Sequence, residues 1–292
     1  MRQRGFVFSL ATVLVFIVIV WFAVFYAGKV EREEASILES YGIAKAGFVA
    51  DDLISDMNVL LGSDVNVWKG QDFTTLWFND KVVADVNKMQ LLDWNSFVDG
   101  NYGVYQNAEI ELGLEKLLDG KTELAFSNGL VYEHAYNPDE NFVQVRKVNG
   151  TDTGVFTYDI TVYVDGGRLN SSVPWTCDAT GDVNVNLRYS DSYGEIENSL
   201  NCEQDSTASY TYTFDFQGGV NGTLQVRFGN VDSNLNAVRV RNAIESPNIT
   251  VSTGIRAEMP SPSGDLVWYY DADLNYVQDD VNLNRKFELG RA

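Results

Sequence analysis

The chain opens with a long, uninterrupted apolar run. Between Phe6 and Ala27 it contains no charged residue, and Ser9 and Thr12 are the only polar interruptions. At about 1.5 Å of rise per residue, a helix over this run would be roughly 33 Å long, and the hydrocarbon core of a bilayer is about 30 Å thick. The pattern therefore predicts a transmembrane helix over 6–27, preceded by a basic leader over 1–5.

After this run the apolar residues become periodic. No proline occurs before Gly62, so nothing in the sequence forces the helix to end. The apolar positions recur mostly at steps of three, four or seven: Ile37, Leu38, Tyr41, Ala44, Phe48, Ile54, Met57 and Leu61. Charged residues fill the other faces, which is typical of an amphipathic helix. We therefore expect 28–62 to continue the apolar helix as an amphipathic stalk.

From residue 63 onward, alternation of period two becomes frequent. Apolar side chains occupy every second position in several runs: 156–164, 183–189, 210–216 and 224–228. Glycine-containing turns separate these runs, and alternation of this kind is typical of strands with one buried face. The pattern predicts a β-rich head over 63–292, built mainly as an antiparallel β-sandwich.

The stretch 63–120 is less regular than the remainder of the head. It contains the strand-like sequence TTLWF and a short helical pattern in AEIELGLEKLLDG, which ends at Gly120. It is either part of the same head or a small mixed subdomain. The predicted fold class is α+β, with a long N-terminal helix, formed by the membrane span and the stalk, followed by the sandwich.

A cleaved signal peptide is the alternative to a retained helix. The apolar region of a signal peptide has about 7 to 15 residues and is followed by a small-x-small cleavage site. The run here is longer, and cleavage after Ala27 would require a small residue where the chain has Phe25. We therefore expect the helix to be retained.

The predicted orientation depends on weak signals. Basic residues on the two sides of the run are nearly balanced: Arg2 and Arg4 before it, and Lys29, Arg32 and Lys45 after it. The short leader, the paired cysteines and the acidity of the head favour a cytoplasmic N-terminus. The expected localisation is a single-pass protein of the cell membrane with an extracellular C-terminal domain, and the lipid bilayer is its first expected partner.

Composition excludes several function classes. Hydrophobic residues make up 45% of the 292 residues and aromatic residues 13%, which is incompatible with a disordered chain. The formal net charge of -20 argues against nucleic acid as a partner, because a polyanion would be repelled. The acidity has two interpretations: it only keeps the protein soluble, or it is typical of an outer surface in contact with salt or divalent cations.

The cysteines, Cys177 and Cys202, are the only two in the chain and lie 25 residues apart. Two cysteines are too few for a four-thiolate metal site. In an oxidising compartment they would form one disulfide, which contributes about 3 kcal/mol on the chain-entropy model. Two unpaired thiols are the alternative.

No motif in the sequence indicates catalysis. The single histidine, His134, lies in a strand-like segment, and the chain has no Gly-x-Ser-x-Gly elbow and neither of the glycine-rich phosphate loops. Carboxylate pairs could catalyse glycoside hydrolysis, but a chain this acidic brings some pair together in almost any fold. We predict a non-enzymatic protein without a cofactor.

An acidic segment near the C-terminus partly resembles a calcium loop. Its sequence is DADLNYVQDD, beginning at Asp271, but an EF-hand loop requires glycine at the position of Tyr276 and glutamate at that of Asn282. The EF-hand interpretation therefore fails. A looser calcium site and a solvated acidic loop are the two remaining interpretations.

Asparagine sequons are the other candidate modification sites. Four residues have the Asn-x-Ser/Thr pattern and would be glycan acceptors in an exported protein: Asn149, Asn170, Asn221 and Asn248.

The N-terminus resembles that of type IV pilin-like proteins, especially archaeal ones. The similarity covers about the first 60 residues: a basic leader ending in Arg4 and Gly5, an apolar helix, and an amphipathic continuation before a β-rich head. The resemblance implies that a peptidase cuts next to Gly5, at the boundary with Phe6, and that the freed helices pack together in a filament. Bacterial pilins carry glutamate where this chain has Leu10, so the archaeal comparison fits better.

Two functions follow from these observations. The first is a pilin-like cell-surface protein, a structural or minor subunit of a filament, whose helix contacts copies of itself or other pilin-like subunits and which supports adhesion. The second is a monomeric, membrane-anchored ectodomain that binds glycan or a partner protein. The observation behind this second function is the set of tryptophans in the head: Trp68, Trp77, Trp94, Trp175 and Trp268.

Overall fold

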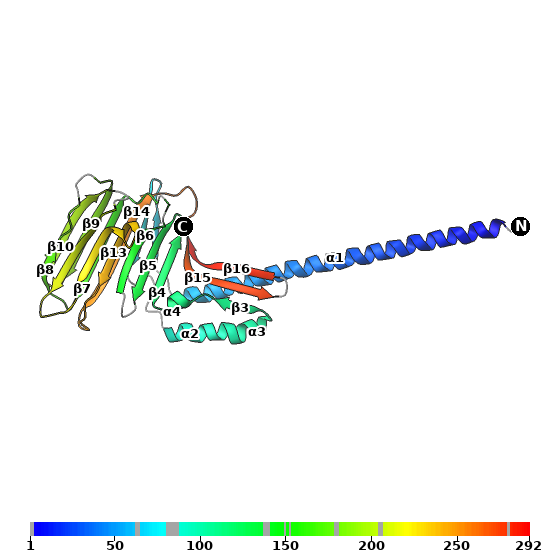
Figure 1. Cartoon of the computed structure of the whole chain (residues 1–292), viewed down its shortest axis with the longest axis horizontal. Helices are drawn as coiled ribbons and strands as arrows, with labels where there is room; N and C mark the ends of the chain where they lie inside the picture. The colour runs from blue at the N-terminus through cyan, green and yellow to red at the C-terminus, as the bar shows by residue number, and fades with distance from the viewer. Residues whose placement is uncertain are drawn as a thin grey trace.

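A helix projects from one end of a β-rich head in the computed structural model (Figure 1). The structure describes residues 3–61, 65–79, 88–136, 141–148, 150–151, 153–177, 181–203, 207–278 and 281–292. Along the first helix it describes the side chains from Phe16 onward, except at positions 31, 34, 35, 38, 58 and 61.

The helical elements all precede the main part of the head. The helix α1 (Gln3–Leu61) has 59 residues. A short helical segment follows between the second and third strands and consists of α2 (Lys88–Phe97), the π-helical turn η1 (Val98–Tyr102) and α3 (Gly103–Gln106). One further turn, α4 (Glu115–Leu118), precedes the fourth strand.

Two sheets form the sandwich, and both are assembled from distant parts of the chain. The six-stranded sheet has the order β1-β2-β14-β7-β9-β10. Its strands are β1 (Asn66–Lys69), β2 (Phe73–Asn79), β14 (Thr250–Pro260), β7 (Thr157–Asp165), β9 (Val183–Asp191) and β10 (Gly194–Cys202).

The ten-stranded sheet has the order β16-β15-β4-β5-β6-β13-β12-β11-β8, and β3 also pairs with β15. Its strands are β3 (Glu109–Leu112), β4 (Lys121–Phe126), β5 (Leu130–Tyr136), β6 (Asn141–Lys147), β8 (Leu169–Val173), β11 (Ser209–Phe216), β12 (Leu224–Val231), β13 (Asn234–Asn242), β15 (Val267–Gln278) and β16 (Val281–Arg291).

The alternating patterns of the sequence become the inner faces of these sheets. On β7 the apolar positions Tyr158, Ile160 and Val162 are buried, and the residues between them point outward. This confirms the prediction of a β-sandwich. Pairing is antiparallel throughout the described strands with one exception, because β7 and β9 run parallel.

Aromatic pairs hold the two sheets together. Phe78 on β2 stacks on Tyr132 of β5 with ring centroids 5.0 Å apart, and Tyr189 on β9 stacks on Phe214 of β11 at 4.6 Å. Stacked aromatic pairs contribute about 0.5–1.5 kcal/mol beyond the area that they bury. They lie in the core cluster that extends between the two sheets.

The predicted fold class, α+β with a long apolar helix at the N-terminus, was wrong. Strands contain 51% of the residues and helices 25%, so the protein is mainly β rather than α+β. Within the residues that the structure describes, no helix combines the length and the apolar character needed to cross a bilayer.

The same finding corrects the predicted localisation. A single-pass membrane protein with a cytoplasmic N-terminus requires a membrane-spanning helix over 6–27, and the described part of α1 does not provide one.

The C-terminal part of α1 docks on the head. Its buried residues follow one another at intervals of three residues or one residue, so they lie on one face of the helix: Ala46, Val49, Ala50, Leu53, Ile54 and Met57. This face, which we call the docked face, packs against β15 and β16. At Gly42 an added Cβ would lie 2.9 Å from Cγ2 of Val281, so the absence of a side chain lets the β15–β16 hairpin approach the helix.

Polar contacts hold the helix on either side of the docked face, one to β16 and one to η1. Asp51 forms an ion pair with Arg285 of β16 at 2.6 Å, and Asp52 accepts a hydrogen bond of 2.7 Å from the hydroxyl of Tyr102. Burial and the neighbouring Asp52 carboxylate raise the pKa of Tyr102 to about 12, so this hydroxyl remains a donor at neutral pH.

We expect Met57→Ala to lower the free energy of unfolding by about 2–5 kcal/mol, because it leaves a cavity in the docked face. Urea unfolding followed by tryptophan fluorescence measures the change. Val59→Ala is the matched control, since Val59 lies two residues away and is 82% exposed; it should change stability by less than about 0.5 kcal/mol. Equal effects of the two substitutions would show that the docked face does not support the head.

Candidate functional site: the exposed surface of helix α1

The N-terminal part of α1 carries apolar side chains that no described residue of the head covers. From Phe16 to Tyr26 the large side chains are 47% to 68% exposed. Successive helical residues are about 100° apart, so this surface surrounds the helix rather than forming one stripe. Figure 1 shows that this part of α1 extends away from the head.

The rings of this segment contact one another along the helix. Trp21 stacks on Phe25 with centroids 5.8 Å apart, and Phe22 on Tyr26 at 6.5 Å. These contacts join residues of the same helix at i and i+4, so they leave the outer sides of the rings in solvent.

An apolar stripe continues along α1 beside the head. It consists of Val30, Ile37, Tyr41, Phe48 and Val59, which are 50% to 82% exposed. Their spacings of 7, 4, 7 and 11 residues are close to whole helical turns, so all five lie within about 40° of one line. We call this stripe the outer seam.

The outer seam lies opposite the docked face. From Phe48 to Leu53 or to Met57 the helix turns by about 140–180°, which places the two sets of apolar residues on opposite sides. The head therefore covers the docked face of α1 and leaves the residues of the outer seam exposed.

Two exposed apolar side chains of α3 lie near the contact between α3 and α1. Val104 and Tyr105 are exposed, and the Lys45 ammonium donates a hydrogen bond of 2.5 Å to the backbone carbonyl of Gln106. This contact places α3 beside α1, so the exposed apolar surface of α1 is extended by two residues of the head.

The leader residues lie partly outside the described structure. The backbone of Arg4, Gly5 and Phe6 belongs to α1, but their side chains are not among those described. Processing next to Gly5 stays a prediction.

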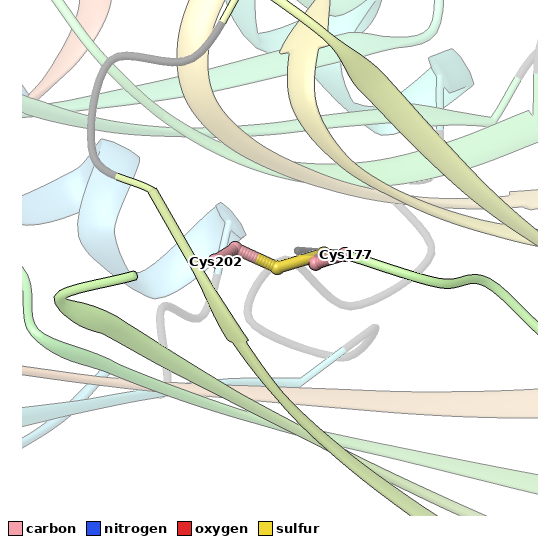
Figure 2. The surroundings of a disulfide bond; sticks show 2 residues. All are labelled: Cys177 and Cys202. Carbon is pink, nitrogen blue, oxygen red and sulfur yellow. A yellow bond between two sulfur atoms is a disulfide. The ribbon is translucent and has the colours of Figure 1, made fainter. Parts of the chain in front are cut away.

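The two cysteines form a disulfide, which excludes the alternative of unpaired thiols (Figure 2). Their Cα atoms are 5.6 Å apart, and Cys202 is completely buried at the end of β10. The bond joins the segment that follows β8 to β10 and closes a loop that contains β9. Cys177 and Cys202 therefore have a structural role.

Three of the sequon asparagines are accessible. Asn170 on β8, Asn221 and Asn248 are exposed, as glycan attachment requires, whereas Asn149 lies outside the described residues. Attachment of glycan at these positions stays a prediction.

The acidic segment near the C-terminus is a strand rather than a loop as far as Gln278, and Asp279 and Asp280 lie outside the described residues. Asp271, Asp273 and Asn275 lie on β15, where Asp271 pairs with Lys116 and Asn275 donates to Glu111 at 3.4 Å. In the part of the chain that the structure describes, no three metal-ligating side chains come together.

His134 lies on β5 in a cross-strand environment. Its neighbours in register are Thr122 on β4 and Val143 on β6, and its ring centroid is 5.4 Å from that of Tyr136. Thr122 supplies a hydroxyl at one of these two register positions, but neither position holds the carboxylate that orients the histidine of a catalytic triad.

The tryptophans of the head differ in exposure. Trp175 and Trp268 are buried in the core, Trp77 and Trp94 are half-buried, and Trp68 is 59% exposed. Aromatic residues are therefore available on the surface of the head for a ligand.

Comparisons with known proteins assign no relative to this chain: no family model, no curated protein and no solved structure matches it.

We expect the double variant Cys177→Ser, Cys202→Ser to lose about 3 kcal/mol of stability, because the unfolded chain regains the freedom of the open loop. Urea unfolding of the variant and of the wild type, each with and without dithiothreitol, measures the loss. The reductant should lower the stability of the wild type to that of the variant and leave the variant unchanged. A variant as stable as the oxidised wild type would contradict this role.

Proposed function

We propose that this chain is a non-enzymatic structural subunit that assembles with copies of itself through helix α1. The observation that carries the proposal is the exposed apolar surface of α1, which surrounds the helix from Phe16 to Tyr26 and continues as the outer seam. The resemblance of the N-terminus to type IV pilin-like proteins supports the same interpretation.

An uncovered surface of this size requires a partner. Complete burial of one large apolar side chain contributes about 1.5–3 kcal/mol, and contiguous exposed apolar patches mark interaction sites. A helix that is apolar on all sides is normally buried on all sides. The N-terminal part of α1 therefore needs several neighbours rather than one.

Another copy of the same helix satisfies this requirement. Each copy brings an identical apolar surface, and no charged residue interrupts it between Phe16 and Ala27. The outer seam extends the contact along the head, because the docked face and the seam lie on opposite sides of α1. Removal of the leader next to Gly5 would free the helix end for packing, as in the pilin-like family.

The acidic heads oppose assembly at low salt. With a formal net charge of -20 on each chain, neighbouring copies repel one another, and the apolar contacts of α1 must offset that repulsion. The balance sets the conditions under which the subunits associate.

Sedimentation and electron microscopy of the full chain, and of a chain that begins at Phe6, test the proposal. We expect oligomers or fibres, and we expect Tyr41→Ser, Phe48→Ser to weaken them by removing apolar contacts from the outer seam. Ile43→Ser is the matched control, because Ile43 is 59% exposed on the same helix but lies off the seam. Monomers in both chains, or monomers that sediment only with lipid vesicles, would contradict the proposal.

Assembly should also increase with ionic strength. The Debye length falls from about 10 Å at 0.1 M salt to about 3 Å at 1 M, which screens the repulsion between acidic heads. Light scattering of the wild type from 0.05 to 1 M sodium chloride measures the effect, with the double seam variant as the control. Dissociation at high salt would indicate that ion pairs rather than apolar contacts hold the copies together.

A further inference from the structure

The outward face of the six-stranded sheet carries an ordered array of polar side chains. Strand alternation directs one set of residues into the core and the other set outward. The cross-strand register aligns five outward residues in a row over five strands: Trp77, Arg256, Asp159, Asn186 and Ser199.

A hollow of about 380 Å³ lies over this row. Its lining includes Trp77, Asp159, Asn186, Arg188 and Arg256. A second hollow shares Trp77, Thr161 and Arg188 with the first and extends toward Tyr163, so the two adjoin, and we call them together the groove.

Gly254 shapes the floor of the groove. A Cβ at this position would lie 2.6 Å from Oγ1 of Thr161 and 3.1 Å from Cζ2 of Trp77. Because glycine has no side chain, the indole of Trp77 can lie over β14. Trp77 is half-buried there and contributes an aromatic surface at one end of the groove.

The polar side chains of the groove hold one another in position. Asn186 donates a hydrogen bond of 2.6 Å to Asp159, whose other carboxylate oxygen is 3.5 Å from the Arg256 guanidinium. Arg188 donates to Glu197 at 2.9 Å. Fixed polar groups beside an aromatic surface, in a hollow, are the usual elements of a small-ligand site.

The charges of the groove identify the ligand class. Arg188 and Arg256 are paired with Glu197, Asp159 and Glu258, so the groove has no large excess of either sign. A polyanion would gain little there, and it would be repelled by the net charge of the chain. A neutral ligand with many hydroxyl groups matches both the paired donors and acceptors and the aromatic surface.

We infer that this groove binds a neutral oligosaccharide, with one sugar ring against Trp77 and its hydroxyl groups on Asp159, Asn186 and Arg256. The groove lies on β2, β14, β7, β9 and β10, and Figure 1 shows β7, β9 and β10 at the end of the head away from the projecting part of α1. Binding there does not depend on assembly through α1.

Isothermal titration of the full chain with cellohexaose, mannohexaose and hexa-N-acetylchitohexaose, each in turn, tests this inference. We expect saturable binding of at least one of them and a loss of about tenfold or more in affinity with Trp77→Ala, which corresponds to about 1.4 kcal/mol. Asp159→Ala should weaken binding as well, and this variant keeps the aromatic surface if Trp77→Ala disturbs folding. Trp68→Ala is the control, because Trp68 is an exposed tryptophan of β1 outside the groove, and it should bind within twofold of the wild type.

Three results would overturn the inference. The first is the absence of saturable binding by any of the three oligosaccharides. The second is binding that survives both Trp77→Ala and Asp159→Ala. The third is tighter binding of a sulfated oligosaccharide such as a heparin hexasaccharide, which would assign the groove to anions.

Discussion

Helix α1 packs one face against the β15–β16 hairpin, and this contact determines which surfaces the molecule leaves open. Leu53 and Met57 fill the docked face, while Gly42 lets the hairpin approach the helix closely at Val281. Because a helix that docks on a flat hairpin can bury only one of its sides, the opposite side remains in solvent. The apolar residues on that side are therefore free to contact another molecule.

Much of the sandwich could be predicted from local patterns. The alternation over 156–164 reproduces the buried face of β7, because the direction of a side chain in a strand depends only on position. The helical pattern predicted over 108–120 was partly wrong: Glu109–Leu112 is the strand β3, and only Glu115–Leu118 is helical. The cause is tertiary, since β3 pairs with β15 from the far end of the chain.

The surfaces that matter for function were harder to predict. The periodicity of the stalk placed Phe48 and Met57 in one amphipathic pattern, but the structure buries Met57 and exposes Phe48. Periodicity shows that a residue is on an apolar side and does not show which side the head covers. The groove could not be predicted at all, because Trp77, Asp159 and Arg256 are brought together only by strand pairing across the sheet.

The position of the docking hairpin at the end of the chain affects how the protein is made. Asp51 and its ion-pair partner Arg285 are separated by 234 residues. At a synthesis rate of about 5–20 residues per second, the first helix leaves the ribosome on the order of ten seconds or more before its own binding surface exists. A nascent chain therefore carries both apolar sides of α1 without their binding surface during that part of translation.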